Sequence, residues 1–555
     1  MIFESEYHVD IPDTDLLTFL FSRTPFKDTD PIWINPANPS NHVTLAKARD
    51  LTHQIGQGYR DLGIGATRGA DKDIVLSYIE NQVMVAPNNL GVICAGGIHA
   101  TCSVTATAFE LARQIRLSSP KILICSPQTR KAAEEAIDQS GVDGTQLVMM
   151  VSEKLDIVDV SGKSIISDRR LAWQRITDPA ILERTPACLV YSSGTTGNPK
   201  GVVITHSNIV ANLCQMAFHF DHFAQKAISD GIYLRMPGVM QNAVAVGIFV
   251  QNMMCLQCGM QVYMFPKYDF PTLMSSIKKF QLSACFIVPA IWNRVVQECT
   301  REDLASIRFA MSGASPLPLP LQLKVHDMLP DGVVLRVNWG MTETVTAASQ
   351  PNVTEVDREG SSGRLLPNIQ AVIISPEGKK LGHKEPGELC IKGPNIIKEY
   401  FNNPEATRAA YTSDGWFHTG DIAYFDTDGK LFIVGRSKEL LKYKSFQVSP
   451  TEVESVLGQL PGISDVGVIG VSDGEGNDLP RAYIVRSEKG KTAGLSEKDV
   501  HDFLNPRVSN YKRLRGGVRF VEEIPRNLNQ KIMRNVLKEW VEKETGERSN
   551  FRARL

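Results

Sequence analysis

The most informative part of the chain reads Ala187-Cys188-Leu189-Val190-Tyr191-Ser192-Ser193-Gly194-Thr195-Thr196-Gly197-Asn198-Pro199-Lys200-Gly201. An apolar run typical of a buried strand leads into a loop rich in hydroxyl groups and glycine that ends near Lys200. Glycine permits the tight curvature that lets successive N–H groups converge on an anion, and the hydroxyls add neutral donors. The composition therefore predicts a polyphosphate-binding loop. It is not the G-x-x-x-x-G-K-[ST] loop of Walker-type NTPases, because no Gly-Lys-Ser/Thr follows at the required offset.

The residues on either side of this loop argue against a flexible linker, the usual meaning of such a composition. Val202-Val203-Ile204-Thr205 follows at once as a second strand pattern, so the loop lies between two buried strands. Elsewhere, apolar runs such as residues 74–78 and 121–125 alternate with helical patterns such as residues 45–62 and 106–116. This alternation predicts an α/β architecture of layers with largely parallel sheets.

The overall composition is that of a soluble globular protein. Of the 555 residues, 43% are apolar and 22% are charged, and the length allows roughly two to four domains. The net charge of −1 argues against a nucleic-acid partner, which usually requires a basic excess. The amino terminus lacks a signal-peptide pattern, and no run approaches about 20 unbroken apolar residues. We therefore expect a soluble intracellular protein without an integral membrane segment.

The ten cysteines lie mostly beside apolar neighbours, which predicts reduced, buried thiols in a cytosolic-type compartment. The one close pair, Cys255 and Cys258, has no second pair and no histidine at ligand spacing. We expect this pair to pack in the core, without zinc or redox chemistry.

A change of character late in the chain indicates a second unit. A turn containing Asp428-Gly429 joins two strand patterns as in a hairpin, and a lysine-rich strip follows Gly435-Arg436. Ser449-Pro450-Thr451-Glu452 then reads as a helix start, with Ser449 as the cap and Glu452 closing a capping box. We expect a large body of layered α/β subdomains over residues 1–435 and a small α+β domain over residues 436–555.

Residues 191–202 closely resemble the nucleotide loop of the adenylate-forming superfamily, which includes acyl-CoA synthetases, coumarate–CoA ligase and firefly luciferase. Further stretches match the family's motifs in the family's order, and together they cover nearly the whole chain. They are residues 312–317 (SGASPL), 339–343 (WGMTE), 387–389 (GEL), 415–421 (GWFHTGD), 434–444 (VGRSKELLKYK) and 531–534 (KIMR). The resemblance implies a large adenylation domain followed by a small mobile domain.

The resemblance also implies a reaction in which a carboxylate attacks the α-phosphate of ATP and pyrophosphate leaves. Two anions must meet, so cations and donors have to be arranged beforehand. Thr342 would contact the α-phosphate, and Glu343 would bind Mg²⁺ through oxygen, the ligand that a hard cation prefers. Asp421 would accept hydrogen bonds from the ribose hydroxyls, with Arg436 nearby. Trp339 stands where the family usually has tyrosine, and its ring would offer a π face to the adenine. The other nucleotide-binding positions would be Ala314 and, around the β- and γ-phosphates, Ser192, Ser193, Gly194, Thr195, Thr196, Gly197 and Lys200.

The small domain would supply different residues to the two half-reactions. Lys531, at the exposed start of a helical pattern, would reach the α-phosphate and the carboxylate during adenylation. Lys438 would be the hinge about which the domain reorients, and Lys442 would approach when a thiol attacks the adenylate. Met240, Gln241, Gly313 and Gly340 would belong to the acid pocket. Because Met240 stands where relatives usually carry histidine, the identity of the acid does not follow from the family.

Ser445 leaves the acceptor open. It stands where relatives that use coenzyme A usually carry glycine, which lets pantetheine pass close to the backbone. The favoured interpretation is an AMP-forming acid–CoA ligase that uses ATP, Mg²⁺ and coenzyme A on a small carboxylic acid. The alternatives are transfer to an amine or another non-CoA acceptor, and a nucleotide-binding protein without catalysis. Thr195, Glu343, Asp421 and Lys531 argue against the last.

The final residues, Ala553-Arg554-Leu555, follow the small–basic–leucine pattern of the S-K-L peroxisomal address. We expect a peroxisomal import receptor to bind this terminus. Without import, the protein would be cytoplasmic.

Overall fold

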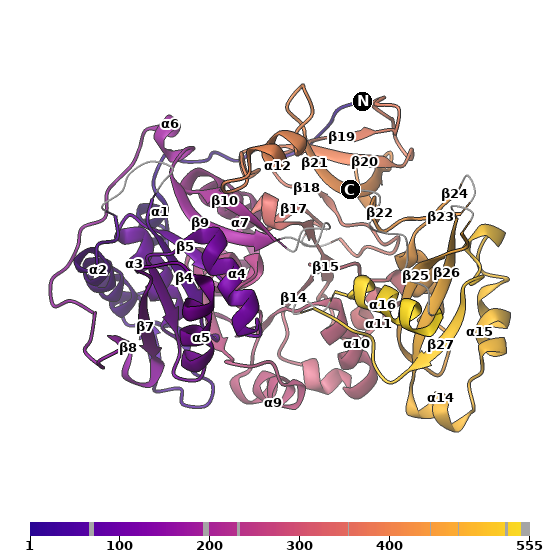
Figure 1. The fold of residues 1–555 in the computed structure, drawn as a ribbon, viewed down its shortest axis with the longest axis horizontal. Helices are drawn as coiled ribbons and strands as arrows, with labels where there is room; N and C mark the ends of the chain where they lie inside the picture. The colour runs from indigo at the N-terminus through magenta and orange to yellow at the C-terminus, as the bar shows by residue number, and fades with distance from the viewer. Residues whose placement is uncertain are drawn as a thin grey trace.

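The computed structural model describes residues 1–65, 72–192, 199–229, 233–352, 355–443, 446–474, 477–527 and 531–545. Strands and helices alternate through most of the chain, and the last part forms a separate small unit at the right of Figure 1. The predicted α/β class, with a large amino-terminal and a small carboxy-terminal domain, is confirmed.

The first layer of the body is a seven-stranded sheet in the order β10-β9-β5-β4-β6-β7-β8. Its central strands run parallel, and β10 and β8 pair antiparallel at the two edges. Figure 1 shows α2 and α3 on one side of this sheet and α4 and α5 on the other. The bounds are β4 Ile74–Tyr78, β5 Ile98–Thr101, β6 Ile122–Cys125, β7 Gln146–Val151, β8 Asp156–Asp159, β9 Pro186–Ser192, β10 Lys200–Thr205, α2 Leu45–Asp61, α3 Val85–Cys94, α4 Ala108–Ser118 and α5 Arg130–Ser140.

Two smaller sheets continue the body, in the orders β11-β12-β2-β3 and β13-β14-β15. Because β14 and β15 are parallel, their carboxyl ends meet at one edge, where ligands bind in α/β folds. The predicted site residues Gly313 and Trp339 follow these two strands. The bounds are β2 Pro31–Ile34, β3 His42–Thr44, β11 Leu234–Gly238, β12 Met260–Met264, β13 Ala284–Phe286, β14 Phe309–Ser312, β15 Leu335–Val337, α7 His206–Ser229, a π-helix Val246–Met254, α8 Cys255–Cys258, α9 Phe270–Phe280, α10 Pro289–Glu298 and α11 Leu319–Met328.

An antiparallel five-stranded sheet, β1-β19-β20-β21-β22, lies at the top of Figure 1 beside the short sheet β16-β17-β18. The predicted hairpin around Gly429 is confirmed as the turn between β21 and β22. The bounds are β1 Phe3–Glu4, β16 Trp339–Gly340, β17 Ala347–Gln350, β18 Arg364–Leu365, β19 Gln370–Ile374, β20 Gly387–Lys392, β21 Phe417–Phe425, β22 Leu431–Arg436 and α12 Pro404–Ala409.

The small unit is built on the sheet β25-β26-β27, with α13 and α15 packed on one face and α16 on the other. Asn293 of α10 donates a hydrogen bond to the carbonyl of Ser464 in β25 (3.3 Å), which links this unit to the body. The bounds are β23 Leu441–Tyr443, β24 Phe446–Val448, β25 Ile463–Ser472, β26 Asp478–Arg486, β27 Gly517–Val521, α13 Pro450–Leu457, α14 Glu488–Thr492, α15 Glu497–Leu504 and α16 Arg534–Thr545.

The helix predicted after Ser449 exists, but the predicted capping box is wrong. α13 begins at Pro450, as expected for proline at a first helical position. The Ser449 hydroxyl, however, donates to the carbonyl of Val434 in β22 (2.8 Å), and Glu452 pairs with Lys512. Contacts to other parts of the fold replace the local hydrogen bonds that the sequence pattern offered.

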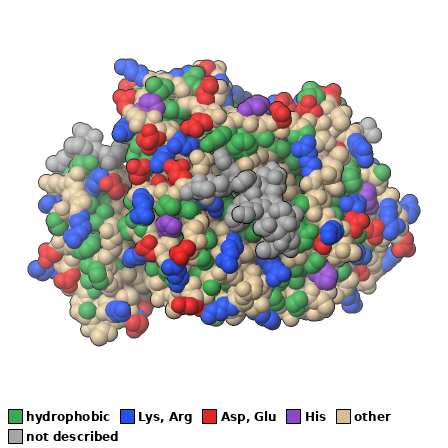
Figure 2. Space-filling model, turned by 180° about the vertical axis from the view of Figure 1, so that it is seen from behind, with side chains coloured by type: hydrophobic (Ala, Val, Ile, Leu, Met, Phe, Trp, Pro, Cys, Tyr) green, Lys and Arg blue, Asp and Glu red, His purple; other side chains and the backbone are tan. Residues whose placement is uncertain are grey.

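Charges of both signs are interspersed over the face shown in Figure 2, where Lys and Arg lie among Asp and Glu. Cys255 and Cys258 are buried, as predicted from their apolar neighbours. Within the described part of the chain, none of the helices combines the length and the apolar character that crossing a membrane requires.

Candidate active site

The carboxylate of Asp421 is held by side chains from two other strands. It lies on β21 directly opposite Arg436 of β22, and the Arg436 Nε lies 2.8 Å from its Oδ1. Trp339 donates from its indole Nε1 to the other oxygen, Oδ2, at 2.8 Å. Both Asp421 and Trp339 are buried. A carboxylate offers about four lone-pair sites, so this one keeps acceptor capacity for two ribose hydroxyls.

Trp339 owes its position to a tight hairpin between β16 and β17, whose register shifts at Gly340. A Cβ on Gly340 would lie 1.9 Å from the carbonyl oxygen of Thr346, so no side chain fits there. Val345 closes the following turn with φ 66° and ψ −63°, and the Thr346 N–H donates to the Thr344 carbonyl at 2.9 Å. This γ-turn is strained for a β-branched residue, and such strain often marks a functional segment. Between these two constraints lie Thr342 and Glu343.

Glu343 is buried and accepts a hydrogen bond from the hydroxyl of Tyr400 (3.0 Å). Burial and the nearby Glu343 carboxylate raise the pKa of Tyr400 above its usual range, so the phenol remains a donor. The Tyr400 ring in turn lies 5.0 Å from the ammonium of Lys200, within the range of a cation–π interaction. One phenol thus links the end of the predicted phosphate loop to the predicted metal ligand.

Tyr400 was not among the residues predicted from sequence. It reaches the site because it forms a β-bridge with Val202, and because the Phe401 N–H donates to the Gly201 carbonyl (2.7 Å). No local motif around Tyr400 signals this long-range contact. The remaining acceptor capacity of Glu343 fits a hard cation such as Mg²⁺, which prefers carboxylate oxygen.

Lys531 brings the small unit to this cluster. Its N–H donates to the Asn527 side chain (3.0 Å), and the Asn527 N–H donates to its carbonyl (2.9 Å), so these two residues hold each other ahead of α16. Lys531 is an exposed residue, but enough protein surrounds its ammonium for desolvation to lower its pKa. Arg436 lowers this pKa further, whereas the carboxylates of Asp421, Glu439 and Glu343 raise it. Lys531 therefore lies within electrostatic range of the groups predicted to hold ATP.

Two buried amide side chains hold Met240, one of the residues predicted for the acid pocket. Asn81 and Gln251 both donate to the carbonyl of Met240, at 2.8 and 2.6 Å, and the Met240 N–H donates to Gln251 (3.0 Å). Gln251 belongs to the π-helix, a form frequent at functional sites. Gln241 accepts from the Ser103 hydroxyl at 3.0 Å. The side chain of Met240 is buried in an apolar cluster with Val239, so this wall of the predicted pocket is apolar.

The other predicted residues lie at several separate places. Gly313 and Ala314 follow β14; a Cβ on Gly313 would lie 3.2 Å from the Asn338 carbonyl, and Ala314 has φ 67°. Lys438 and Lys442 are exposed, and the Lys442 N–H donates to Asp478 (3.0 Å). Ser192 ends β9 opposite Lys200. The predicted residues that lie outside the described part of the chain are Ser193, Gly194, Thr195, Thr196, Gly197 and Ser445.

Comparison with protein families decides what kind of site this is. The AMP-binding enzyme family matches residues 23–401, and the AMP-binding enzyme C-terminal domain matches residues 452–531. The chain belongs to the AMP-binding enzyme family. The resemblance inferred from the motifs is confirmed, and with it the prediction of an AMP-forming ligase.

Individual members of the AMP-binding family match over nearly the full length. The chain is 32% identical to phenylacetyl-CoA ligase epaB of Aspergillus niger, over 97% of this chain and 99% of that protein. It is also 32% identical to peroxisomal OPC-8:0-CoA ligase 1 of Arabidopsis thaliana, over 95% and 93%. Among solved structures, ATP-bound MatB from Rhodopseudomonas palustris superposes with a TM-score of 0.81 at 25% identity, covering 96% and 99% of the two chains.

Proposed function

We propose that this AMP-binding enzyme is an acid–CoA ligase that activates a small carboxylic acid with ATP and transfers the acyl group to coenzyme A. The observation that carries the proposal is that Lys531, from the small unit, lies within electrostatic range of Asp421 and Glu343 of the body. A cation at this point lowers the repulsion between an incoming carboxylate and the phosphates of ATP. The CoA ligases among the full-length relatives support the same reaction class.

In the first half-reaction, an oxygen of the acid attacks the α-phosphorus of ATP, the bond to the bridging oxygen breaks, and pyrophosphate leaves. Asp421 holds the ribose and Trp339 offers its ring to the adenine. Lys200 and the loop after Ser192 bind the outer phosphates. Lys531 stabilises the negative charge that accumulates between the acid and the α-phosphate. Glu343 would hold Mg²⁺, which supplies positive charge beside the phosphate oxygens.

In the second half-reaction, the sulfur of coenzyme A attacks the acyl carbonyl and AMP leaves. Lys442 is an exposed residue of β23, so it needs a reorientation of the small domain to reach the adenylate. We assign the hinge to Lys438 and the domain boundary to Gly435–Lys438, with the large domain over residues 1–435 and the small mobile domain over residues 436–555. The end of the body's sheet at Arg436 supports this boundary.

We further propose import into peroxisomes through Ala553-Arg554-Leu555. The carboxy-terminal tripeptide supports this proposal, and so does the peroxisomal relative in Arabidopsis.

The experiment that tests the activity incubates the purified protein with ATP, Mg²⁺, coenzyme A and a panel of aryl and fatty acids. Mass spectrometry then follows acyl-AMP, acyl-CoA and AMP. We expect acyl-CoA and stoichiometric AMP with at least one class of acid. Acyl-AMP without any thioester would transfer the assignment to a non-CoA acceptor. If every acid leaves ATP unchanged while ATP still binds, the protein is a nucleotide-binding protein without catalysis.

A further inference from the structure

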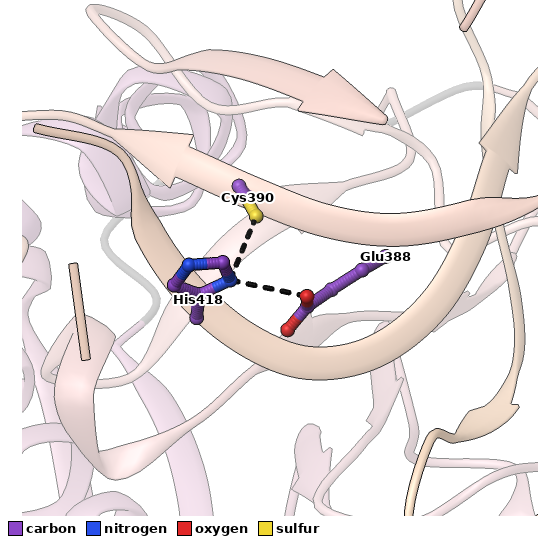
Figure 3. Close-up of side chains that lie close together, drawn as sticks. All are labelled: Glu388, Cys390 and His418. Carbon is purple, nitrogen blue, oxygen red and sulfur yellow. Dashed lines mark hydrogen bonds and ion pairs between the residues drawn. The ribbon is translucent and has the colours of Figure 1, made fainter. Parts of the chain in front are cut away.

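Three side chains with metal-ligating atoms meet on the sheet that carries Asp421. Glu388 and Cys390 come from β20, and His418 comes from β21. The Nδ1 of His418 lies 3.1 Å from Glu388 Oε2 and 3.4 Å from Cys390 Sγ. All three ligand atoms lie within 4.8 Å of one another. Figure 3 shows the imidazole turned toward both the thiol and the carboxylate.

The strand register explains why these residues meet. Cys390 lies directly opposite His418, and Glu388 precedes Cys390 by two residues and therefore shares its face of β20. His418 alternates along β21 with Phe417 and Thr419, which are buried, so it occupies the more exposed face. Cys390 lies on the same face as its partner His418, but it is buried in a cluster with Val372 and Trp416. Glu388 and His418 remain about one-third exposed, so an ion has access from solvent.

We propose that Glu388, Cys390 and His418 bind one zinc ion, with water as the fourth ligand. Zinc takes sulfur, nitrogen and oxygen ligands in tetrahedral geometry with bonds of about 2.0–2.3 Å. Such bonds hold neighbouring ligand atoms about 3.3–3.6 Å apart, close to the separations found around His418 Nδ1. A thiol and an imidazole are poor ligands for Mg²⁺ or Ca²⁺, which favour oxygen. This site is separate from the one proposed for Mg²⁺ at Glu343.

The lysines near the three ligands have partners other than Glu388. Asp414 is paired with Lys380 (3.1 Å), and the ammonium of Lys392 is held by the Asp414 carbonyl (2.7 Å). Lys392 and Lys380 also lie over the Trp416 ring, at 4.5 and 5.5 Å. The neighbouring cations are thus occupied with other partners, and Glu388 lies beside the imidazole.

A zinc ion here would stiffen the segment that presents Asp421. The register of β20 and β21 shifts between the pairs Glu388–Ile422 and Cys390–His418, which leaves Thr419, Gly420 and Asp421 in the irregular part. Within it, the Thr419 hydroxyl donates to the Leu389 carbonyl (2.7 Å) and accepts from the Asp421 N–H (3.1 Å). Because Glu388 and Cys390 lie on the two sides of this register shift, an ion bound to both would hold the two strands together there. We therefore assign it a structural role next to the ribose-binding residue.

The test titrates Co²⁺, as a spectroscopic substitute for zinc, into chelator-treated full-length protein with Mg²⁺ in excess. We expect one Co²⁺ per chain, with intense visible bands of tetrahedral cobalt and a near-ultraviolet thiolate-to-cobalt band, both abolished by adding Zn²⁺. Cys390→Ser should lose the thiolate band, and Glu388→Gln, which preserves side-chain shape and hydrogen bonding to His418, should weaken binding at least roughly tenfold. Cys299→Ser, a half-buried cysteine elsewhere, is the matched control and should bind like the wild type.

Thermal unfolding gives a second readout, because a ligand that binds only the folded protein raises its Tm. Zinc should raise the Tm of the wild type and of Cys299→Ser but not that of Cys390→Ser. The proposal is overturned if the wild type shows no thiolate band, or if the band persists in Cys390→Ser. In either case the three residues form only a hydrogen-bonded cluster. The outcome does not depend on whether the enzyme makes acyl-CoA.

Discussion

At the scale of single residues, the role proposed for Lys531 in adenylation depends on its positive charge. The protonated form is the active one, so the rate should fall as pH rises through the lowered pKa of Lys531, below the 10.5 of an ordinary lysine. Lys531→Arg keeps its charge to higher pH and should move this alkaline limb upward. Lys531→Ala should reduce adenylate formation by roughly 10²–10³-fold. The measurement is pyrophosphate release as a function of pH.

The matched control for Lys531 is Lys498→Ala, an exposed lysine of α15 that pairs only at the surface with Asp502. Its rate and pH profile should equal those of the wild type. An alkaline limb that stays in place in Lys531→Arg would contradict the assignment of that limb to Lys531.

Tyr400 is the residue whose role appeared only in the structure, and Tyr400→Phe tests it. The change keeps the ring beside Lys200 but removes the donor to the buried Glu343 carboxylate, a bond worth roughly 1.5–3 kcal/mol. Without this bond, Glu343 should bind Mg²⁺ more weakly, and we expect the adenylation rate to need about tenfold more Mg²⁺ to reach saturation. Tyr411→Phe loses a hydrogen bond to the Ile397 carbonyl, not to Glu343, and should lower stability without changing the Mg²⁺ dependence. Equal Mg²⁺ dependence in both variants would refute the link between Tyr400 and the metal.

At the scale of elements, the β16–β17 hairpin positions Trp339 and Glu343 through a close backbone contact. Gly340→Ala forces a methyl group against the Thr346 carbonyl, and overpacking of this kind costs about 1–3 kcal/mol. We expect a lower free energy of unfolding and a strongly reduced adenylation rate. The control is Gly458→Ala at the end of α13, where the nearest atom lies at 3.4 Å and φ is −62°, so stability should stay equal or rise slightly. Denaturant unfolding measures the free energy of unfolding of both variants. A Gly340→Ala protein as stable as the wild type would disprove the close contact between Gly340 and Thr346.

At the scale of the whole molecule, the two lysines of the small domain should act in different half-reactions. Lys531 lies near the ATP-site carboxylates, whereas Lys442 is exposed on β23. Lys442→Ala should therefore leave acyl-AMP formation unchanged and slow thioester formation from supplied acyl-adenylate by roughly 10²-fold. The two half-reactions are measured separately in single-turnover experiments. If Lys442→Ala forms thioester at the wild-type rate, Lys442 has no part in the CoA stage.

Cellular location is also a property of the whole chain, because the proposed address is its last three residues. A fluorescent protein fused to the amino terminus leaves Leu555 free, and we expect punctate fluorescence that coincides with a peroxisomal marker in eukaryotic cells. The Leu555 deletion should be diffuse. A diffuse signal from the intact tail as well would rule out import through this tripeptide.

The sequence alone determined the α/β class and the family, because these depend on apolar periodicity and on short motifs such as residues 415–421. Tertiary structure decided which residues of those motifs touch. Trp339 donates a hydrogen bond to Asp421, 82 residues away in the sequence, and Tyr400 donates one to Glu343, 57 residues away. The same holds for Ser449, whose hydroxyl donates to β22 and does not cap the backbone of its own helix, and for Cys390, which meets His418 only through the register of β20 and β21. A local pattern states which hydrogen bonds a residue can make, but the register and packing of distant strands determine which of them form.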